Sequence, residues 1–100
     1  MLASDWTITA EQLRKCITSV TLVDVREPEE YVEGHIEGCR LIPLGELHDR
    51  APAELKRDED IVLYCAAGIR SLEGLMTLKM MGYQKLRSLT GGIAAWDESK

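Results

Sequence analysis

Short uninterrupted apolar runs alternate along this chain with longer segments in which apolar and polar residues are mixed. The runs at 21–25 and 61–64 are rich in β-branched and aromatic residues, which is typical of strands buried on both faces. Further short strands are predicted at 40–42 and 86–89, and a first one from near Asp5 to Ile8. The pattern therefore predicts five strands.

The segment before the second strand is predicted to be a helix over about 9–17. Thr9 and Gln12 have the separation of a capping box, and Leu13 and Ile17 follow four residues apart. This places the first predicted helix between the first two strands.

A second helix is predicted from Ser71 to Met81, with Ser71 as its N-terminal residue and Gly82 as its stop. The apolar residues at helical spacing in it are Leu72, Leu75, Met76 and Met80. Shorter helices are expected after Pro28, over 44–51, from Pro52 to Lys56 and over 93–96. Strands that alternate with helices in this way predict an α/β domain: a parallel sheet with helices on both faces.

Length and charge narrow the possible functions. The 100 residues, 45% of them hydrophobic, are enough for one domain over 1–100. A formal net charge of −5 with scattered cations argues against nucleic-acid binding as the main activity. Residues 1–9 lack the pattern of a secretory signal, and no apolar stretch approaches the roughly 20 residues that span a bilayer. We therefore expect a cytoplasmic protein that does not enter membranes.

The three cysteines are Cys16, Cys39 and Cys65. Their odd number and wide spacing predict neither a disulfide framework nor a zinc site, and free thiols fit a reducing compartment. Cys16 is interpreted as a packing residue and Cys39 as packed or half exposed, and no metal is expected.

Cys65 is the candidate catalytic residue, because it follows a predicted strand directly and precedes a predicted helix. Ligands bind at the carboxyl ends of strands in open α/β sheets. The loop residues whose backbone N–H groups can surround the sulfur are Ala66, Ala67, Gly68, Ile69 and Arg70. With a left-handed Gly68, the helix N-terminus and the Arg70 guanidinium nearby, the thiolate should be favoured. The alternative is a buried cysteine that only packs.

The segment from Cys65 to Ser71, CAAGIRS, resembles the active-site loop of the rhodanese sulfurtransferases. Two further segments agree with that family: DVREPEEY at 24–31 with GHIEG at 34–38, and GGIAAW at 91–96. Together they cover most of the chain in the right order. The resemblance implies a rhodanese-like fold with a five-stranded parallel sheet, and no cofactor.

It also implies a reaction in which Cys65 carries sulfur as a persulfide. The thiolate attacks the outer sulfur of a donor such as thiosulfate or a persulfide, and cyanide or a thiol removes that sulfur. In a cell the implied acceptor is a thiol, such as thioredoxin or a sulfur-carrier protein. The apolar loop residues predict weak thiosulfate binding, since only Arg70 is charged.

Two alternatives stay open from the sequence. One is a non-enzymatic rhodanese-like module that carries sulfur or binds a protein partner. The other is a cysteine phosphatase or arsenate reductase, whose loops have one residue more between the cysteine and the arginine.

Charged residues elsewhere receive structural interpretations. Arg26 either orients the catalytic loop together with Asp24 or pairs with Glu29 or Glu30, and the planar guanidinium favours the second reading. His35 is interpreted as a turn residue, and His48 as a solvated one. The glycines at 91–92 are expected to pack beneath the catalytic loop, and Trp96 to cover an edge of the core.

Overall fold

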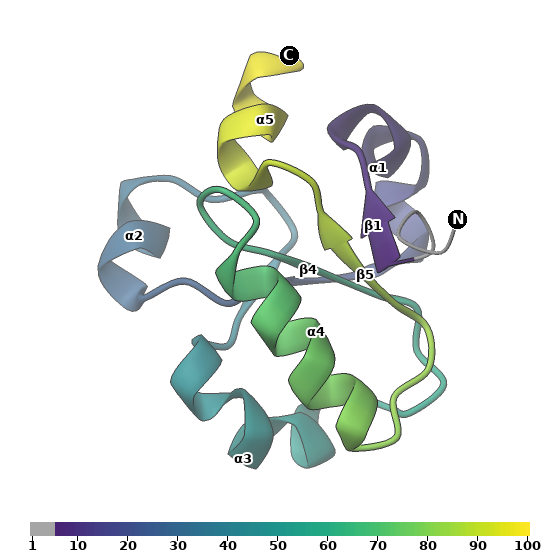
Figure 1. Cartoon of the computed structure of the whole chain (residues 1–100). Coiled ribbons are helices and arrows are strands. Elements are labelled where there is room, and N and C mark those ends of the chain that lie inside the picture. The colour runs from purple at the N-terminus through teal and green to yellow at the C-terminus, as the bar shows by residue number, and fades with distance from the viewer. Residues whose placement is uncertain (1–5) are drawn as a thin grey trace.

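The computed structural model describes residues 6–100 and contains one five-stranded sheet (Figure 1). Its strands are β1 (Thr7–Ile8), β2 (Thr21–Asp24), β3 (Arg40–Leu41), β4 (Ile61–Tyr64) and β5 (Leu86–Leu89). Their order across the sheet is β1-β5-β4-β2-β3, and every neighbouring pair is parallel. The predicted five-stranded parallel sheet is confirmed, with Asp5 of the first strand outside the described residues.

Helices cover both faces of this sheet, as predicted. They are α1 (Ala10–Cys16), the 3₁₀ helix η2 (Ile17–Ser19), α2 (Pro28–Glu33), α3 (Leu44–Glu54), α4 (Arg70–Met80) and α5 (Gly92–Glu98). Helices α3 and α4 lie on one face, and α1 and α5 on the other (Figure 1). Among residues 6–100, no helix is both long enough and apolar enough to cross a membrane.

The central strand β4 divides the core into two halves. All four of its residues are fully buried, and successive side chains of a strand point to opposite faces. Ile61, Leu63 and Cys65 therefore pack with α3 and α4, whereas Val62 and Tyr64 pack with α1 and α5. Cys65 and its neighbour Tyr64 thus belong to different halves of the core.

The capping box that the sequence predicts for α1 is confirmed. The Gln12 amide donates to the Thr9 hydroxyl at 3.1 Å, and the Thr9 amide donates to the Gln12 side chain at 2.9 Å. Pro28 lies in the first turn of α2, as predicted. Local sequence signals therefore place both helix starts.

The buried face of α4 differs from the apolar positions that the sequence suggests. Its buried residues are Ser71, Gly74, Leu75 and Leu78, whereas Leu72, Met76 and Met80 are exposed. The reason is Gly74, where an added Cβ would lie 3.2 Å from the Leu47 side chain of α3. Small residues let α4 approach α3 closely, and this contact orients the helix.

The prediction of a helix break at Pro52 is wrong. Helix α3 continues through Pro52 to Glu54, and the Leu55 amide donates to the Ala51 carbonyl at 2.8 Å. Proline removes one hydrogen bond from a helix. Here the loss falls in the last turn, where buried Ala51 packs in the core and Arg50 pairs with Glu54 at 2.7 Å.

Candidate active site

Cys65 lies at the carboxyl end of the central strand β4, where the chain turns into a short loop before α4. Its relative exposure is only 1%. Gly68 has the predicted left-handed backbone, with φ of +103°. This conformation, which side chains disfavour, turns the loop back over the sulfur.

The sulfur of Cys65 accepts backbone hydrogen bonds from its own loop. The Gly68 amide lies 3.1 Å and the Ser71 amide 3.3 Å from Sγ, and the Ser71 hydroxyl is 3.5 Å away. Burial opposes ionisation of this thiol, but the hydrogen bonds from Ser71, Gly68 and Ala67 outweigh it and lower the pKa of Cys65. The thiolate is therefore favoured, as the sequence predicts.

Ser71 belongs to this ring of donors, although the sequence reasoning assigned the ring to residues 66–70. The first amides of a helix have no carbonyl partner within it, and Ser71 is the second residue of α4. The position of Ser71 at the start of the predicted helix could have identified its amide as a donor to the sulfur. Ile69 lies on the outside of the loop with 78% exposure.

Arg70, expected near the thiolate, has its pKa raised chiefly by a hydrogen bond to Glu30 and more weakly by the charge of Cys65. Its two terminal nitrogens bind the two carboxylate oxygens of Glu30 at 2.8 and 2.9 Å. This bidentate contact, with a backbone hydrogen bond from Glu27, lowers the pKa of Glu30 to about 2. Glu30 on α2 thereby holds Arg70 beside the loop.

The predicted packing of the glycine pair beneath the loop is confirmed. The Ile93 amide donates to the Cys65 carbonyl at 2.9 Å, and the Ala94 amide donates to the Ala66 carbonyl at 3.3 Å. A Cβ on Gly92 would lie 2.5 Å from the Ala66 carbonyl oxygen. The start of α5 therefore supports the loop from behind at a distance that only glycine permits.

The predicted pairing of Arg26 with Glu29 or Glu30 is wrong. Arg26 binds Asp24 at 2.8 Å and donates to the Gly34 carbonyl at 2.7 Å. Both side chains are buried, and the Asp24 carboxylate raises the pKa of Arg26. Asp24 is the last residue of the buried strand β2 and lies only two positions before Arg26. Its carboxylate is inside the core, so the Arg26 side chain points inward to reach it.

The same buried carboxylate organises a polar cluster around Tyr64. The Tyr64 hydroxyl donates to Asp24 at 2.9 Å and accepts the Ile36 amide at 3.0 Å. The Cys39 sulfur lies 3.3 Å from that hydroxyl. This cluster fixes the segment after α2 against the half of the core opposite Cys65.

The two histidines and Trp96 lie away from the candidate nucleophile. The His35 ring stacks on Tyr31 at 3.8 Å and contacts its carbonyl at 2.9 Å, which suits a structural residue. His48 is exposed, 3.3 Å from Asp49. Trp96 is buried at the edge of the core, as predicted.

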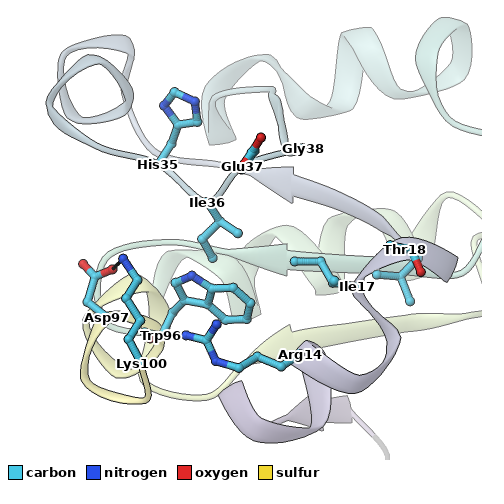
Figure 2. Close-up of a pocket in the computed structure, with 11 residues that line it drawn as sticks. Arg14, Ile17, Thr18, His35, Ile36, Glu37, Gly38, Trp96, Asp97 and Lys100 are labelled. Carbon is cyan, nitrogen blue, oxygen red and sulfur yellow. Dashed lines mark hydrogen bonds and ion pairs between the residues drawn. The ribbon is translucent and has the colours of Figure 1, made fainter.

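A large hollow is also separate from the Cys65 loop. It measures about 910 Å³ and lies between η2, the turn at 35–38 and the end of α5. In Figure 2 the Arg14 guanidinium lies against the Trp96 ring, whereas the His35 ring points away from both. A smaller hollow of about 250 Å³ lies beside the loop, and Arg26, Glu30 and Ile93 are among its lining residues. In the described part of the chain, no three His, Cys, Asp or Glu side chains form a group that could hold a metal ion.

Comparison with known families agrees with this geometry. The model of the rhodanese-like domain matches residues 9–99. The chain belongs to the rhodanese-like family. A Mycobacterium tuberculosis protein named HTH-type transcriptional regulator Rv0324 is 63% identical over 79 residues, which are 77% of this chain and 34% of that protein. A sulfurtransferase from Allochromatium vinosum is 38% identical over 77% of this chain and 71% of its own length.

The rhodanese-like domain also has close structural neighbours. The human single-domain sulfurtransferase TSTD1 superposes with a TM-score of 0.86 at 27% identity, over 94% of this chain and 96% of that one. The family thus includes single-domain proteins of about this length and longer proteins of which the domain forms about a third.

Proposed function

We propose that this rhodanese-like domain is a sulfurtransferase that moves a sulfane sulfur through a persulfide on Cys65. The observation that carries the proposal is the Cys65 sulfur itself, held by the Gly68 and Ser71 amides with a lowered pKa. The rhodanese-like fold and the relatives named sulfurtransferases support sulfur transfer in general. The substrate-binding residues proposed are the loop residues Ala66, Ala67, Gly68, Ile69 and Arg70, together with Ser71.

The reaction has two displacement steps. The Cys65 thiolate attacks the outer sulfur of thiosulfate, a new S–S bond forms, and sulfite leaves with the electron pair of the bond that breaks. An acceptor, cyanide or a thiolate, then attacks the terminal sulfur and the Cys65 thiolate leaves. The amides around the sulfur stabilise negative charge in both steps, because they are held in place before the reaction. No step needs a metal or an organic cofactor.

Arg70 and Glu30 bear on the choice of donor. Thiosulfate is a dianion, and the guanidinium nearest the loop is already bound by a carboxylate. The rest of the loop is apolar, so little positive charge is free to bind this donor. We therefore propose that thiosulfate binds weakly and that a persulfide is the better donor. The cellular acceptor proposed is a thiol, such as thioredoxin or a sulfur-carrier protein, in the cytoplasm.

A second candidate function is a module that holds sulfur or binds a protein without rapid turnover. The similarity to a regulator, in which the matching region is about a third of the protein, favours this candidate. A cysteine phosphatase or arsenate reductase is less well supported. The loop has four residues between Cys65 and Arg70, and its donors close on one sulfur atom.

The test is intact-protein mass spectrometry after mixing with thiosulfate or a low-molecular persulfide, followed by cyanide. We expect the wild type to gain the mass of one sulfur and to lose it to cyanide as thiocyanate. Cys65→Ser should gain nothing, while the control Cys16→Ser should react like the wild type. A persulfide that forms but is not turned over would favour the carrier module. Failure of both donors to load folded protein would contradict the proposal.

A further inference from the structure

Two serine hydroxyls lie in line behind the candidate nucleophile. The Ser71 Oγ is 3.5 Å from the Cys65 Sγ, and the Ser88 Oγ is 2.7 Å from the Ser71 Oγ. Both serines are buried, with relative exposures of 0% and 2%. The three side chains form a chain of hydrogen bonds that begins at the sulfur and ends inside the protein.

Ser88 reaches Ser71 from β5, the strand next to β4. It is the register partner of Leu63, whose side chain points to the same face of the sheet as Cys65. This face carries α4, so Ser88 and the second residue of that helix meet above the sheet. The Ser88 hydroxyl has the Ser71 hydroxyl as a hydrogen-bond partner.

We propose that Ser88 is a positioning residue that orients the Ser71 hydroxyl toward the sulfur of Cys65. The inference deepens the proposed function and rests on it, since it concerns how the same nucleophile is prepared. Ser88 does not touch the sulfur and acts through Ser71.

The two protonation states of Cys65 favour opposite directions of this chain. With a thiolate, the Ser88 hydroxyl donates to the Ser71 oxygen, and the Ser71 hydroxyl donates to the sulfur. With a thiol, the S–H group donates to the Ser71 oxygen, and the Ser71 hydroxyl donates to the Ser88 oxygen. No proton is gained or lost by either serine.

The Ser88 hydroxyl stabilises the hydrogen-bond direction of the thiolate more than that of the thiol. A hydrogen bond to an ionised acceptor is about twice as strong as one between neutral groups, and S–H is a weak donor. A donor behind Ser71 also polarises its hydroxyl, so successive hydrogen bonds strengthen one another. Removing the Ser88 hydroxyl should therefore disfavour the thiolate.

The experiment is the pH dependence of iodoacetamide alkylation at Cys65, resolved from the other cysteines by peptide mass spectrometry. We expect the alkylation midpoint to rise by about one pH unit in Ser71→Ala and by about half a unit in Ser88→Ala. In Ser71→Ala/Ser88→Ala the midpoint should equal that of Ser71→Ala, because Ser88 acts through Ser71. An unchanged midpoint in Ser88→Ala would overturn the proposal. So would a further rise of the midpoint in the double variant above Ser71→Ala that equals the rise caused by Ser88→Ala alone.

Two controls separate positioning from structure. Thr90→Ala removes an exposed hydroxyl just after β5 and should leave the midpoint unchanged. Ser88→Thr keeps the hydroxyl, whereas Ser88→Val lacks it although valine has the same shape as threonine. We expect only the valine variant to raise the midpoint, even if both lose stability equally. Alkylation needs no sulfur donor, so the result is independent of whether sulfur transfer is observed.

Discussion

Cys65 and Cys39 lie on opposite faces of the sheet, and the pKa values of their thiols shift in opposite directions. Cys65 is almost fully buried and Cys39 is only partly buried. Burial opposes ionisation at both sites, yet the pKa of Cys65 is lowered whereas that of Cys39 is raised. Exposure therefore does not decide which cysteine has the more acidic thiol.

The hydrogen bonds around each sulfur account for the difference. Cys65 accepts hydrogen bonds from the Gly68 and Ser71 amides of its loop. At Cys39 burial raises the pKa, the hydrogen bond with the Tyr64 hydroxyl lowers it too little to compensate, and the Asp24 charge raises it further. The hydrogen bonds on the Cys65 side stabilise a thiolate. On the Cys39 side the Asp24 carboxylate instead binds Arg26 and Tyr64 and so stabilises the fold.

The largest effect is expected from Gly92→Ala, which acts on the Cys65 side. A methyl group there would collide with the carbonyl oxygens of Cys65 and Ala66, and φ of +61° adds backbone strain. We expect a loss of about 4 kcal/mol of unfolding free energy and a higher alkylation midpoint at Cys65.

Urea denaturation of Gly92→Ala, with Gly45→Ala as its control, measures this effect. Gly45 lies exposed on α3 with open space around it, so alanine should be neutral or slightly stabilising. A Gly92→Ala variant as stable as the control would show that α5 does not constrain the loop.

The next largest effect is expected from Asp24→Asn, on the Cys39 side. The buried Arg26 would lose its ionic partner, at a cost of about 3 kcal/mol in denaturation experiments. The pKa of Cys39 should fall because the Asp24 charge is gone, whereas the Cys65 midpoint should hardly move. Asp49→Asn, at an exposed site, should change stability little. If Asp24→Asn moved the Cys65 midpoint strongly, the two halves would not be independent.

The sequence predicted those parts of the site that depend on local order along the chain. Cys65 follows a recognisable buried strand, and Gly68 and the glycine pair at 91–92 stand where a tight loop and a close approach need them. The sheet followed from the alternation of strands and helices. These features are each carried by a few adjacent residues.

Contacts between distant residues could not be predicted in the same way. Arg70 pairs with Glu30, forty positions away, and Ser71 meets Ser88 on another strand. Their partners depend on how α2, α4 and β5 pack. The same holds for Arg26, which pairs with Asp24 and not with Glu29 or Glu30, the partners that the sequence favoured. Packing between distant residues also decides which face of α4 is exposed. The contact of Gly74 with α3, and not the apolar pattern of the helix, sets the buried side.

A smaller effect, a rate difference of about tenfold between two cysteines, is expected when the wild type is alkylated at pH 7. Cys65 should react about ten times faster than Cys39, since the thiolate is the reactive form. The rate at Cys65 should rise with pH and level off below the ordinary cysteine pKa of about 8.5. Because folding lowers this pKa, ionisation of Cys65 should favour the folded state increasingly as the pH rises toward that value.

Peptide mass spectrometry at several pH values can measure both cysteines in one sample. Cys65→Ser serves as the control that assigns the fast phase. Faster alkylation of Cys39 would contradict this prediction and would mean that its greater exposure outweighs the hydrogen bonds at Cys65.

The smallest effect is expected from Glu30→Gln, which releases Arg70 beside the loop. Glutamine can still accept the Glu27 amide, but it no longer neutralises the guanidinium. We expect the thiosulfate KM to fall about threefold with little change in kcat, because a free cation attracts the anionic donor. The pair is about one third exposed, so stability should change by less than about 1 kcal/mol. Glu29→Gln makes the same charge change on the exposed side of α2 and should leave KM unaltered. A lower kcat with unchanged KM in Glu30→Gln would instead mean that Glu30 positions Arg70 for the reaction, and the carboxylate would then assist the donor rather than compete with it.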